Sequence, residues 1–460
     1  MTKHYLILGL GKSGLSAAYY LCHQNANVVL ADTREQVSGI DAFKKSFPEV
    51  SVSLGGLPLS LLDNIDTLVI SPGLSPEQPI VKEALRRDIE VIGDIELFCR
   101  HAYSPIIAVT GTNAKSTVVT LIAKMIADAG YRVGLGGNIG TPALALLNKT
   151  KDEADFYVLE LSSFQLESTS SLKAKVAVVL NITPDHMDRY DSFDDYVNTK
   201  LRIFNGCENA LYNHDDDLTI PRNNEPVKIS FGIGKNFKQT ALSYSLNQNV
   251  ASTDLLRGDE VIVTDDMLQL KGTHNHLNCL AAIAVCDAIG IERSRQRKSL
   301  QEFSGLPHRC ETIADIHGVS WVNDSKGTNV GATLAALKGF GKAFPKKIIL
   351  ILGGVSKDAS FSSLINPINQ FVKRILVYGQ DAGKIIADLS GAVDCQIDEL
   401  EEFEAVISKA YSIASEQDLV LFSPACASFD MFDSFEHRGE VFKKQVLAFG
   451  PFSDKERGAC

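Results

Sequence analysis

The sequence predicts three α/β domains in series, with sheets that are mainly parallel. The chain has 460 residues, and at about 150 residues per domain this length favours about three domains. Short apolar runs alternate with helical spacing along the chain, which is the pattern of βαβ units. Two of these runs pass directly into polar turns that contain glycine, as strands do in nucleotide-binding domains.

The composition is that of a folded globular protein. Hydrophobic residues make up 45% and charged residues 22% of the chain, and no segment is biased enough to indicate disorder. The 45 Lys and Arg residues against 56 Asp and Glu residues give a net charge of −11, which disfavours nonspecific binding to nucleic acids or anionic membranes. We therefore expect no nucleic-acid partner, and we expect local features to hold any anionic ligand.

The cysteines and the start of the chain favour a cytoplasmic protein. No CxxC pair is present, so the sequence predicts neither a zinc site nor a disulfide framework, and free thiols suit a reducing compartment. The chain begins with a strand and a glycine turn rather than a signal segment, and no apolar run reaches about 18 residues, so we expect no membrane insertion. The nine cysteines are Cys22, Cys99, Cys207, Cys279, Cys286, Cys310, Cys395, Cys426 and Cys460.

The first predicted domain spans residues 1–95 and opens with a glycine motif. A strand over residues 5–8 runs into Gly9-x-Gly11-x-x-Gly14, and Asp32 follows about 18 residues later, close to the place of the ribose-binding acid in dinucleotide-binding units. The motif alone is compatible with NAD, with any nucleotide diphosphate, or with a tight turn that binds nothing. Further strands are predicted over residues 27–30, 67–70 and 90–92. The helix after the glycine motif is predicted to bury the face that carries Leu15, Ala18, Tyr19 and Cys22.

The second predicted domain spans residues 96–303 and contains a phosphate-binding loop. A strand over residues 105–109 turns through Thr110-Gly-Thr-Asn-Ala-Lys-Ser-Thr117 into a helix. Backbone N–H groups of such a loop can cradle phosphates, Lys115 can neutralise phosphate oxygens and Ser116 can hold Mg²⁺. A strict P-loop has glycine at the positions of Val109 and Ala114. The buried helix face is predicted over Val118, Leu121, Ile122, Met125, Ile126 and Ala129, with Gly130 ending the helix.

Two further strands of this domain end in polar side chains. Glu160 lies near the end of a strand over residues 156–161, and His186 follows a strand over residues 176–180. Because loops at the carboxyl ends of parallel strands converge, both side chains are candidate Mg²⁺ ligands, directly or through water. A lone histidine is also compatible with a purely structural hydrogen bond. The alternating short runs over residues 210–270 predict added antiparallel strands.

The third predicted domain spans residues 304–460. Polar clusters at residues 323–329 and 423–429 follow predicted strands and suit a small zwitterionic substrate, although well-capped loops would look the same. Before this domain, Asn275 and Asn278 could read the edge of a base or could simply belong to a capped helix start. The predicted strands cover residues 319–323, 347–352, 374–378 and 419–423.

The ordered set of motifs resembles the ATP-dependent Mur ligases over nearly the whole chain. The resemblance implies a Rossmann-like first domain that binds a UDP-sugar, a central P-loop-type ATPase domain, and a Rossmann-like C-terminal domain that binds an amino acid. It also implies amide-bond formation through an acyl phosphate, with release of ADP and phosphate, in cytoplasmic peptidoglycan precursor synthesis. The matching motifs are Thr110-Gly-Thr-Asn-Ala-Lys-Ser-Thr117, Glu160-Leu-Ser-Ser163, Asp185-His186, His274-Asn-x-x-Asn278, Pro307-His-Arg309 and Asn323-Asp-Ser-Lys326.

Within the family, the residues are most similar to those of members that add D-glutamate. The resemblance therefore implies UDP-N-acetylmuramoyl-L-alanine and D-glutamate as substrates, ATP and Mg²⁺ as cofactors, and a part in cell-wall biogenesis, cell shape and cell division. We expect a monomer. The similarity rests on Asp32-Thr-Arg34, Asp324-Ser-Lys-Gly-Thr-Asn329, Ser423-Pro-Ala-Cys-Ala-Ser428, Phe435 and Arg438-Gly439.

The resemblance assigns a role to each matching residue. The catalytic residues are Lys115, Glu160, His186 and Lys200, and the Mg²⁺ ligands are Ser116, Glu160, His186 and Lys200, the last as a carbamate. A carbamate turns the cation into an anion that can coordinate Mg²⁺. The ATP contacts are Gly111, Thr112, Asn113, Lys115, Ser116, Thr117, Asn275, Asn278, Arg309 and Asp324. The substrate contacts are Lys12, Ser13, Asp32, Thr33, Arg34, Ser71, Asn138, Ser163, Lys326, Thr328, Lys357, Ser428 and Phe435.

Two positions depart from the family pattern. Ala114 replaces a glycine of the phosphate loop, at a cost of about 1 kcal/mol if the residue needs a positive φ. Val355 stands where an aspartate is usual, which leaves the orientation of Lys357 without its expected support. Three other hypotheses remain: a ligase for another amino acid, such as a folylpolyglutamate synthase or a different Mur enzyme; an NAD-dependent oxidoreductase; and a nucleotide-binding regulator without catalysis.

Overall fold

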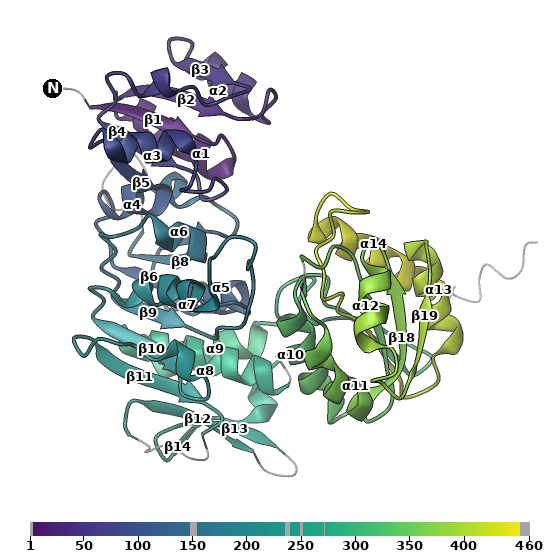
Figure 1. Cartoon of the computed structure of the whole chain (residues 1–460). Coiled ribbons are helices and arrows are strands. Elements are labelled where there is room, and N and C mark those ends of the chain that lie inside the picture. Colours follow the sequence, from purple (N-terminus) through teal and green to yellow (C-terminus); the bar gives the residue numbers. More distant parts are fainter. Residues whose placement is uncertain are drawn as a thin grey trace, which may run out of the picture. The chain divides into compact units, whose positions relative to one another are not determined.

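Three mainly parallel sheets with intervening helices make up the computed structural model (Figure 1). The structure describes residues 3–147, 154–234, 240–248, 252–270, 272–357 and 359–450, and within these ranges the sheets contain five, nine and six strands. This architecture confirms the predicted class of three α/β domains in series.

The sheets belong to two compact units. The first unit contains the five-stranded and the nine-stranded sheets of the described chain, and the second contains the six-stranded sheet. The first unit comprises Met1–Ile182, Arg189–Leu268 and His276–Phe303, and the second comprises Thr183–Asp188, Gln269–Asn275 and Ser304–Cys460.

The first sheet is parallel throughout, with the strand order β3-β2-β1-β4-β5. Because β1 pairs in register with β2 and β4, the turns after these strands lie at one edge. The sequence did not predict β3, which is a short, partly polar edge strand. The elements are β1 (His4–Leu8), α1 (Lys12–His23), β2 (Asn27–Asp32), α2 (Ile40–Ser46), β3 (Ser51–Leu54), β4 (Thr67–Ile70), α3 (Pro79–Arg86), β5 (Glu90–Gly93) and α4 (Asp94–Cys99).

The second sheet has the order β14-β13-β12-β11-β10-β9-β6-β8-β7. The predicted antiparallel addition is confirmed for β13 and β14, whereas β10, β11 and β12 continue the parallel sheet. The sequence did not predict β7, because its three glycines are unfavourable in strands. The elements are β6 (Ile106–Thr110), α5 (Lys115–Asp128), β7 (Val133–Gly137), β8 (Phe156–Glu160), α6 (Ser163–Glu167), β9 (Val176–Val179), α7 (Phe193–Leu201), β10 (Asn209–Asn213), β11 (Val227–Gly232), β12 (Ser243–Gln248), β13 (Thr253–Arg257), β14 (Glu260–Val263), α8 (Thr273–Ala288) and α9 (Arg293–Glu302).

The third sheet has the order β15-β16-β20-β17-β18-β19, and only the pairing of β15 with β16 is antiparallel in the described residues. The four predicted strands are its four central strands, and the two that were not predicted, β15 and β19, lie at its edges. The elements are β15 (Glu311–Ile316), β16 (Val319–Asn323), α10 (Val330–Gly341), β17 (Ile348–Gly353), α11 (Ile365–Phe371), β18 (Val372–Tyr378), α12 (Ala382–Leu389), β19 (Gln396–Glu399), α13 (Phe403–Ile413), β20 (Leu419–Phe422) and α14 (Phe435–Ala448).

Helix α1 is turned slightly from its predicted orientation. Its most buried apolar side chains are Ala17, Ala18 and Leu21, whereas three of the four predicted ones are only partly buried. Both sets follow helical spacing, and small alanines allow the helix to lie close to the sheet. The predicted face of α5 is confirmed except for Ala129, which directly follows the helix and is partly buried, and Gly130 comes next with a φ of +95°.

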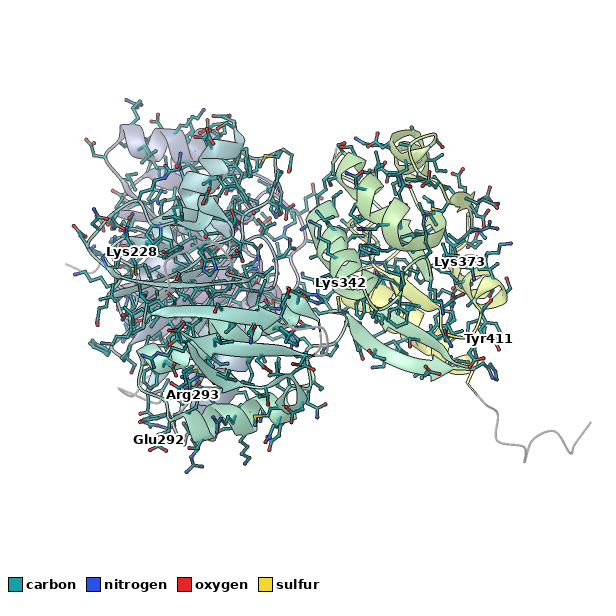
Figure 2. All side chains as sticks on the ribbon, turned by 90° about the horizontal axis from the view of Figure 1, so that it is seen from below. Lys228, Glu292, Arg293, Lys342, Lys373 and Tyr411 are labelled. Atoms are coloured by element: carbon teal, nitrogen blue, oxygen red, sulfur yellow. The ribbon has the colours of Figure 1, made fainter. Side chains whose placement is uncertain are left out.

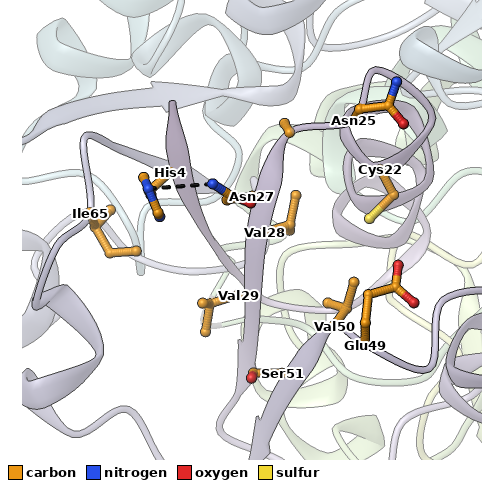
Figure 3. Close-up of a pocket in the computed structure, with 11 residues that line it drawn as sticks. His4, Cys22, Asn25, Asn27, Val28, Val29, Glu49, Val50, Ser51 and Ile65 are labelled. Atoms are coloured by element: carbon orange, nitrogen blue, oxygen red, sulfur yellow. Dashed lines mark hydrogen bonds between the residues drawn. The ribbon is translucent and has the colours of Figure 1, made fainter. Parts of the chain in front are cut away.

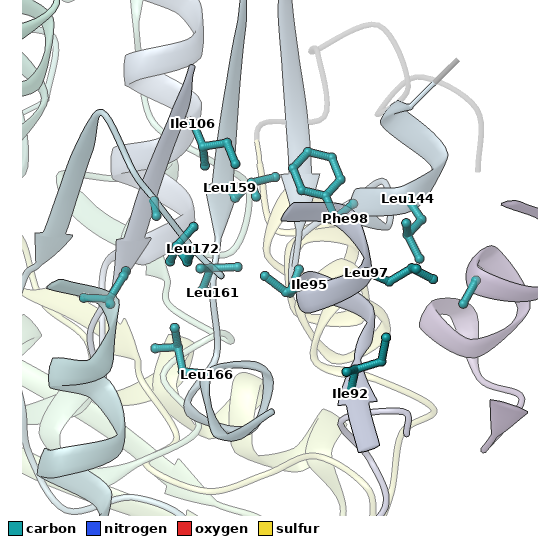
Figure 4. Close-up of a cluster of buried hydrophobic side chains, with 14 of the residues drawn as sticks. Ile92, Ile95, Leu97, Phe98, Ile106, Leu144, Leu159, Leu161, Leu166 and Leu172 are labelled. Atoms are coloured by element: carbon teal, nitrogen blue, oxygen red, sulfur yellow. The ribbon is translucent and has the colours of Figure 1, made fainter. Parts of the chain in front are cut away.

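One apolar core runs from the first sheet into the second (Figure 4). Ile95, Leu97 and Phe98 of α4 are fully buried or nearly so and belong to the same cluster as Leu159 of β8. Phe98 packs edge-on against Tyr157, with ring centroids 5.1 Å apart. The first and second sheets therefore share a core at α4.

Many charged side chains lie on the surface, although several are buried. Glu292, Lys342 and Lys373 are exposed (Figure 2), and Lys373 donates to Asp418 over 2.6 Å. Within the described ranges, no helix is both long and apolar enough to span a membrane. The eight cysteines in these ranges are free thiols, and Cys460 lies outside the described residues.

Candidate active site

The loop between β6 and α5, which the sequence predicts to bind phosphate, contains two residues with a positive φ. Gly111 has a φ of +150°, and a Cβ there would lie 3.2 Å from the Leu180 side chain and 3.3 Å from the backbone of Asn181. Ala114, directly before α5, is left-handed with a φ of +69°. Ala114 therefore has the positive φ that is strained for a residue with a Cβ, and this strain costs about 1 kcal/mol.

Two lysines converge on this loop. Lys115 donates to the carbonyl oxygens of Gly111 and Thr112 over 2.9 and 2.8 Å. Lys200 of α7 donates to the same Gly111 oxygen over 3.0 Å, is 2% exposed, and lies 4.7 Å from the centre of the Tyr196 ring. The sequence pattern alone would have placed Lys200 on a solvated helix face. The structure instead buries it against the phosphate loop.

Glu160 and Ser116 form a buried, hydrogen-bonded pair. The Ser116 hydroxyl donates to Glu160 Oε2 over 2.6 Å, and the Asn138 amide donates to Glu160 Oε1 over 2.8 Å. Glu160 is 3% exposed and Ser116 is 4% exposed. A carboxylate beside a hydroxyl is a donor set that fits Mg²⁺. The structure thus brings together three of the residues assigned from the sequence.

Asn181 braces the phosphate loop, and the sequence analysis did not assign it a role. Its carbonyl accepts from Thr112 N over 2.8 Å, its side-chain oxygen accepts from Asn113 N over 2.8 Å, and its amide donates to Asn113 O over 3.2 Å. The signal was present, because Asn181 follows a buried parallel strand at the edge where ligands bind.

The glycine turn of the first sheet is tightly packed around the carbonyl oxygen of Gly9. A Cβ on Gly14 would lie 1.9 Å from the carbonyl oxygen of Gly9, so only glycine fits there. The Ser71 hydroxyl donates to that same oxygen over 2.5 Å. Lys12 and Ser13 begin α1 at this turn, Lys12 exposed and Ser13 half-buried.

Asp32 fixes the turn rather than presenting a free carboxylate. It accepts from Leu10 N over 2.6 Å and from two guanidinium nitrogens of Arg34 over 2.9 and 2.7 Å. These hydrogen bonds, chiefly that from Arg34, lower the pKa of Asp32 to about 2. Thr33 and Arg34 are exposed beside it. This geometry gives no support to the nicotinamide interpretation, which needs an acid that is free to bind a ribose.

Asp324 is a buried carboxyl group of the second unit. It accepts from the Ser423 hydroxyl over 2.6 Å and from Cys310 N over 3.2 Å. Burial raises the pKa of Asp324 to about 6, while nearby Arg309 acts in the opposite direction. A larger residue does not fit at position 327, because a Cβ on Gly327 would lie 2.7 Å from the Asp324 carboxylate.

Further residues of the second unit lie around the start of α14. The Lys326 ammonium is 3.9 Å from the centre of the Phe435 ring, and Ser428 is 2% exposed. Val355 exchanges two backbone hydrogen bonds of 2.9 Å with Ala427. The segment before Lys357 is therefore held by backbone contacts, and Lys357 itself is exposed with a φ of +52°.

Arg438 ties together two loops of the second unit, and the sequence analysis gave it no role of its own. The guanidinium is fully buried, donates to the Ser325 hydroxyl and carbonyl over 3.0 and 2.7 Å, and donates to Cys426 O over 3.1 Å. These loops carry Thr328 and Ser428. A buried cation that binds carbonyl oxygens stabilises a fixed loop geometry.

The remaining assigned residues are divided between the units. His186 lies in the second unit, with a φ of +57°, in a segment where Asp185 accepts from the Asn329 amide over 3.2 Å. Asn275 also belongs to the second unit, whereas Asn278 belongs to the first, although both lie on α8. Two more residues that were assigned a role from the sequence lie in the first unit. They are the buried Thr117 of α5 and the buried Ser163 of α6.

A pocket of about 320 Å³ lies at the amino ends of the first sheet (Figure 3). His4, Asn27 and Ser51, which begin β1, β2 and β3, contribute to its lining, and the side chains of His4 and Asn27 are 3.4 Å apart. The glycine turn follows the carboxyl end of β1. The pocket is therefore at the edge opposite the candidate site and is not part of it.

Comparison with known protein families identifies the class. Residues 3–93 match the model for the Mur ligase MurD-like N-terminal domain, residues 109–286 the Mur ligase middle domain, and residues 308–426 the Mur ligase glutamate ligase domain. Together with the phosphate loop and the Ser116–Glu160 pair, these matches define the protein: the chain belongs to the Mur ligase family.

Its relatives are UDP-N-acetylmuramoylalanine–D-glutamate ligases. The enzyme of that name from Legionella pneumophila (strain Paris) is 41% identical over 443 residues, which cover 96% of this chain and 98% of the relative. The one from Haemophilus influenzae (strain PittEE) is 44% identical over 448 residues, which cover 97% and 99%.

Solved structures share the fold at low sequence identity. The UDP-N-acetylmuramate-alanine ligase from Thermotoga maritima has a TM-score of 0.60 at 18% identity and covers 97% of this chain and 100% of that chain. A MurF ligase from the same organism, in complex with ADP, has a TM-score of 0.62 at 16% identity, with 92% and 95% covered.

Proposed function

We propose that this chain is the ATP-dependent ligase that joins D-glutamate to UDP-N-acetylmuramoyl-L-alanine in cytoplasmic peptidoglycan synthesis. The observation that carries the proposal is full-length identity of 41–44% to relatives named for that reaction. The buried Ser116–Glu160 pair beside the phosphate loop adds a chemical reason, because it supplies ligands for a metal next to a nucleotide. The exposed Thr33 and Arg34 then serve the uracil end of the substrate.

Mg²⁺ would be held in the first unit by Ser116 and Glu160, with a carbamate on Lys200 as a further ligand. The donor chemistry fits, since both residues of the first pair present oxygen atoms and are buried. When bound, the ion would offset negative charge on the phosphates. Formation of a carbamate would replace the positive charge of the buried Lys200 by a negative charge, which a bound Mg²⁺ would offset.

The first step transfers a phosphoryl group. An oxygen of the L-alanyl carboxylate attacks the terminal phosphorus of ATP, the bond to the bridging oxygen breaks and ADP leaves with that electron pair. Lys115, held at the phosphate loop, offsets charge on the moving group, and the loop N–H groups position it. The product is an acyl phosphate.

The second step forms the amide. The amine of D-glutamate attacks the acyl carbon, a tetrahedral intermediate forms, and the carbon–oxygen bond to phosphate breaks as the nitrogen loses a proton. Thr328, Lys357, Ser428 and Phe435 surround the D-glutamate, and Arg438 holds the loops that carry two of them. Exclusion of water from the acyl phosphate prevents its hydrolysis.

Phosphate release tests the proposal. The assay contains ATP, Mg²⁺ and UDP-N-acetylmuramoyl-L-alanine, and compares D-glutamate with L-glutamate, L-alanine, L-lysine and no amino acid. Release that requires both the UDP-sugar and D-glutamate is the expected result. Release with another amino acid would indicate a related ligase, and no release from folded protein would favour a regulator. ATP and UDP-sugar binding, measured by calorimetry, separates a folded but inactive protein from a failed preparation.

A further inference from the structure

Asp94 is a buried carboxyl group between the first and second sheets that the proposed mechanism does not use. It is the first residue of α4 and is 4% exposed. Gln165 of α6, itself 2% exposed, donates to Asp94 Oδ2 over 3.2 Å. Oδ1 is buried and has no hydrogen-bond partner among the described residues.

The partners of Asp94 belong to the two ends of the proposed site. Ser13, at the start of α1, interacts with the carboxyl through its side chain. Gln165 forms a capping box with Ser162, since its side-chain oxygen accepts from Ser162 N over 3.1 Å and its own N–H donates to the Ser162 hydroxyl. Ser162 lies two residues beyond Glu160. Asp94 thus connects the glycine turn to the strand end that carries the proposed metal ligand.

Burial favours the uncharged form of this group. It raises the pKa of Asp94 above its ordinary value, and the hydrogen bonds from Gln165 and Ser13 only partly oppose it. A hydrogen bond that lowers the pKa of a carboxyl is one that the carboxyl accepts. Asp94 therefore accepts from both Gln165 and Ser13, and it links α6 to the start of α1.

We propose that Asp94 is a positioning residue, which holds Ser13 at the start of α1 and so fixes the glycine turn, where the diphosphate of the UDP-linked substrate binds, relative to α6. The proposal rests on the proposed function for the identity of that substrate. It predicts an effect on UDP-sugar binding that does not extend to ATP or D-glutamate.

Three substitutions at residue 94 test it. Asp94→Asn keeps an acceptor for Gln165 and a donor for Ser13, whereas Asp94→Ala and Asp94→Leu lose both. We expect the alanine and leucine variants to raise the KM for UDP-N-acetylmuramoyl-L-alanine about 5- to 10-fold, the effect of one or two lost hydrogen bonds. The asparagine variant should remain within about twofold of the wild type, and the KM for ATP should not change in any variant.

A second test exchanges the carboxyl and amide groups between positions 94 and 165, so that the total volume of the two side chains is nearly unchanged. Gln165→Glu retains the oxygen of the capping box but loses the donor to Asp94, so alone it should raise the same KM. Combined with Asp94→Asn, whose amide donates to the new carboxylate, it should recover toward the wild-type value. Failure of the double variant to recover, with both proteins folded, would overturn the proposal.

Glu96→Gln is the matched control on the same helix, α4. Glu96 of α4 is 1% exposed and accepts from Ser170 N and Ser171 N over 2.7 and 2.8 Å, away from the glycine turn. This variant should lower the free energy of unfolding without changing the KM for the UDP-sugar. An equal rise in KM for Glu96→Gln, or an equal rise for Asp94→Asn and Asp94→Ala, would show that Asp94 acts only through stability.

Direct binding distinguishes this proposal from the proposed function. The Kd of UDP-N-acetylmuramoyl-L-alanine is measured by calorimetry without ATP or D-glutamate. A weaker Kd for Asp94→Ala than for Asp94→Asn supports the positioning role even if turnover with D-glutamate fails. Equal Kd values for wild type and Asp94→Ala overturn it even if turnover is as proposed.

Discussion

The hydroxyl of Ser116 and the carboxylate of Glu160 are in contact at 2.6 Å although 44 positions separate them in the sequence. The contact arises because β6 and β8 are adjacent parallel strands, so that the loop after one meets the end of the other. Asn138, which follows β7, donates to the other carboxylate oxygen. The sheet therefore fixes the positions of Ser116 and Glu160.

Replacing Glu160 by Gln should lower the rate of phosphate release by at least about 100-fold, since a metal ligand contributes several kcal/mol to stabilising the transition state. The amide can still accept from Ser116, so folding should be retained, as circular dichroism would check. Asp155→Asn, an exposed carboxylate paired with Arg132, is the control and should have near wild-type activity. Wild-type activity of Glu160→Gln at limiting Mg²⁺ would contradict the assignment.

Replacing Ala114 by Gly should relieve strain in the phosphate loop. The left-handed φ of Ala114 costs about 1 kcal/mol, partly offset by the greater flexibility of glycine in the unfolded chain. We expect unchanged or slightly higher stability to urea, by up to about 1 kcal/mol, and a KM for ATP that does not rise. Ala127→Gly, at an exposed position of α5, should instead destabilise by about 0.5 to 1 kcal/mol. Equal losses in the two variants would argue against strain.

Asp32 should make stability depend on pH in the acid range. Its pKa is lowered from 3.8 to about 2 in the folded state, so the unfolded state binds the proton first and the stabilisation is lost as pH falls from about 4 to about 2. Its size is about 1 to 2 kcal/mol, because water partly screens the half-exposed Arg34. The urea-unfolding free energies of wild type and Asp32→Asn should therefore converge toward pH 2. A constant difference from pH 2 to pH 7 would refute this role.

Arg189 should affect UDP-sugar binding through the loop after β4. Its guanidinium donates to Pro72 O and Leu74 O over 3.3 and 3.1 Å and to Glu167 over 2.8 Å. A lysine ammonium cannot match this planar set of donors. Arg189→Lys should therefore raise the KM for the UDP-sugar about 5- to 10-fold and leave the KM for ATP unchanged.

The control for this prediction is Arg132→Lys, at an exposed pair with Asp155. It should change neither constant, because exposed ion pairs contribute little. An unchanged KM for Arg189→Lys would show that the Pro72–Leu74 loop keeps its position without the guanidinium.

The sequence predicted the parts of the fold that have strong local patterns. The central strands and α5 were predicted because buried parallel strands are continuously apolar and α5 is bounded by the phosphate loop and Gly130. The edge strands β3, β7, β15 and β19 were not, because short, polar or glycine-rich segments become strands only by pairing with a neighbour.

The residues of the candidate site also differ in how well the sequence predicts them. The phosphate loop is local in sequence, so Lys115 and Ser116 could be assigned from motif spacing. The bracing by Asn181, the loop contacts of Arg438 and the burial of Lys200 depend on side chains brought together by tertiary packing. Nothing in the spacing of Asp94 and Gln165 indicates that they touch.

The first and second sheets share a core at α4. The boundary between the two ligand-binding domains predicted from the sequence therefore does not coincide with a boundary between folding units. The predicted boundary between residues 95 and 96 falls inside α4, and Ile95, Leu97 and Phe98 would lose their packing partners if the chain were cut there. A fragment that ends at residue 95 would therefore expose apolar surface and bind its nucleotide poorly. Because the first and second sheets belong to one compact unit, we expect them to unfold together, so ligand bound at the first sheet should also protect the amides of the second against hydrogen exchange.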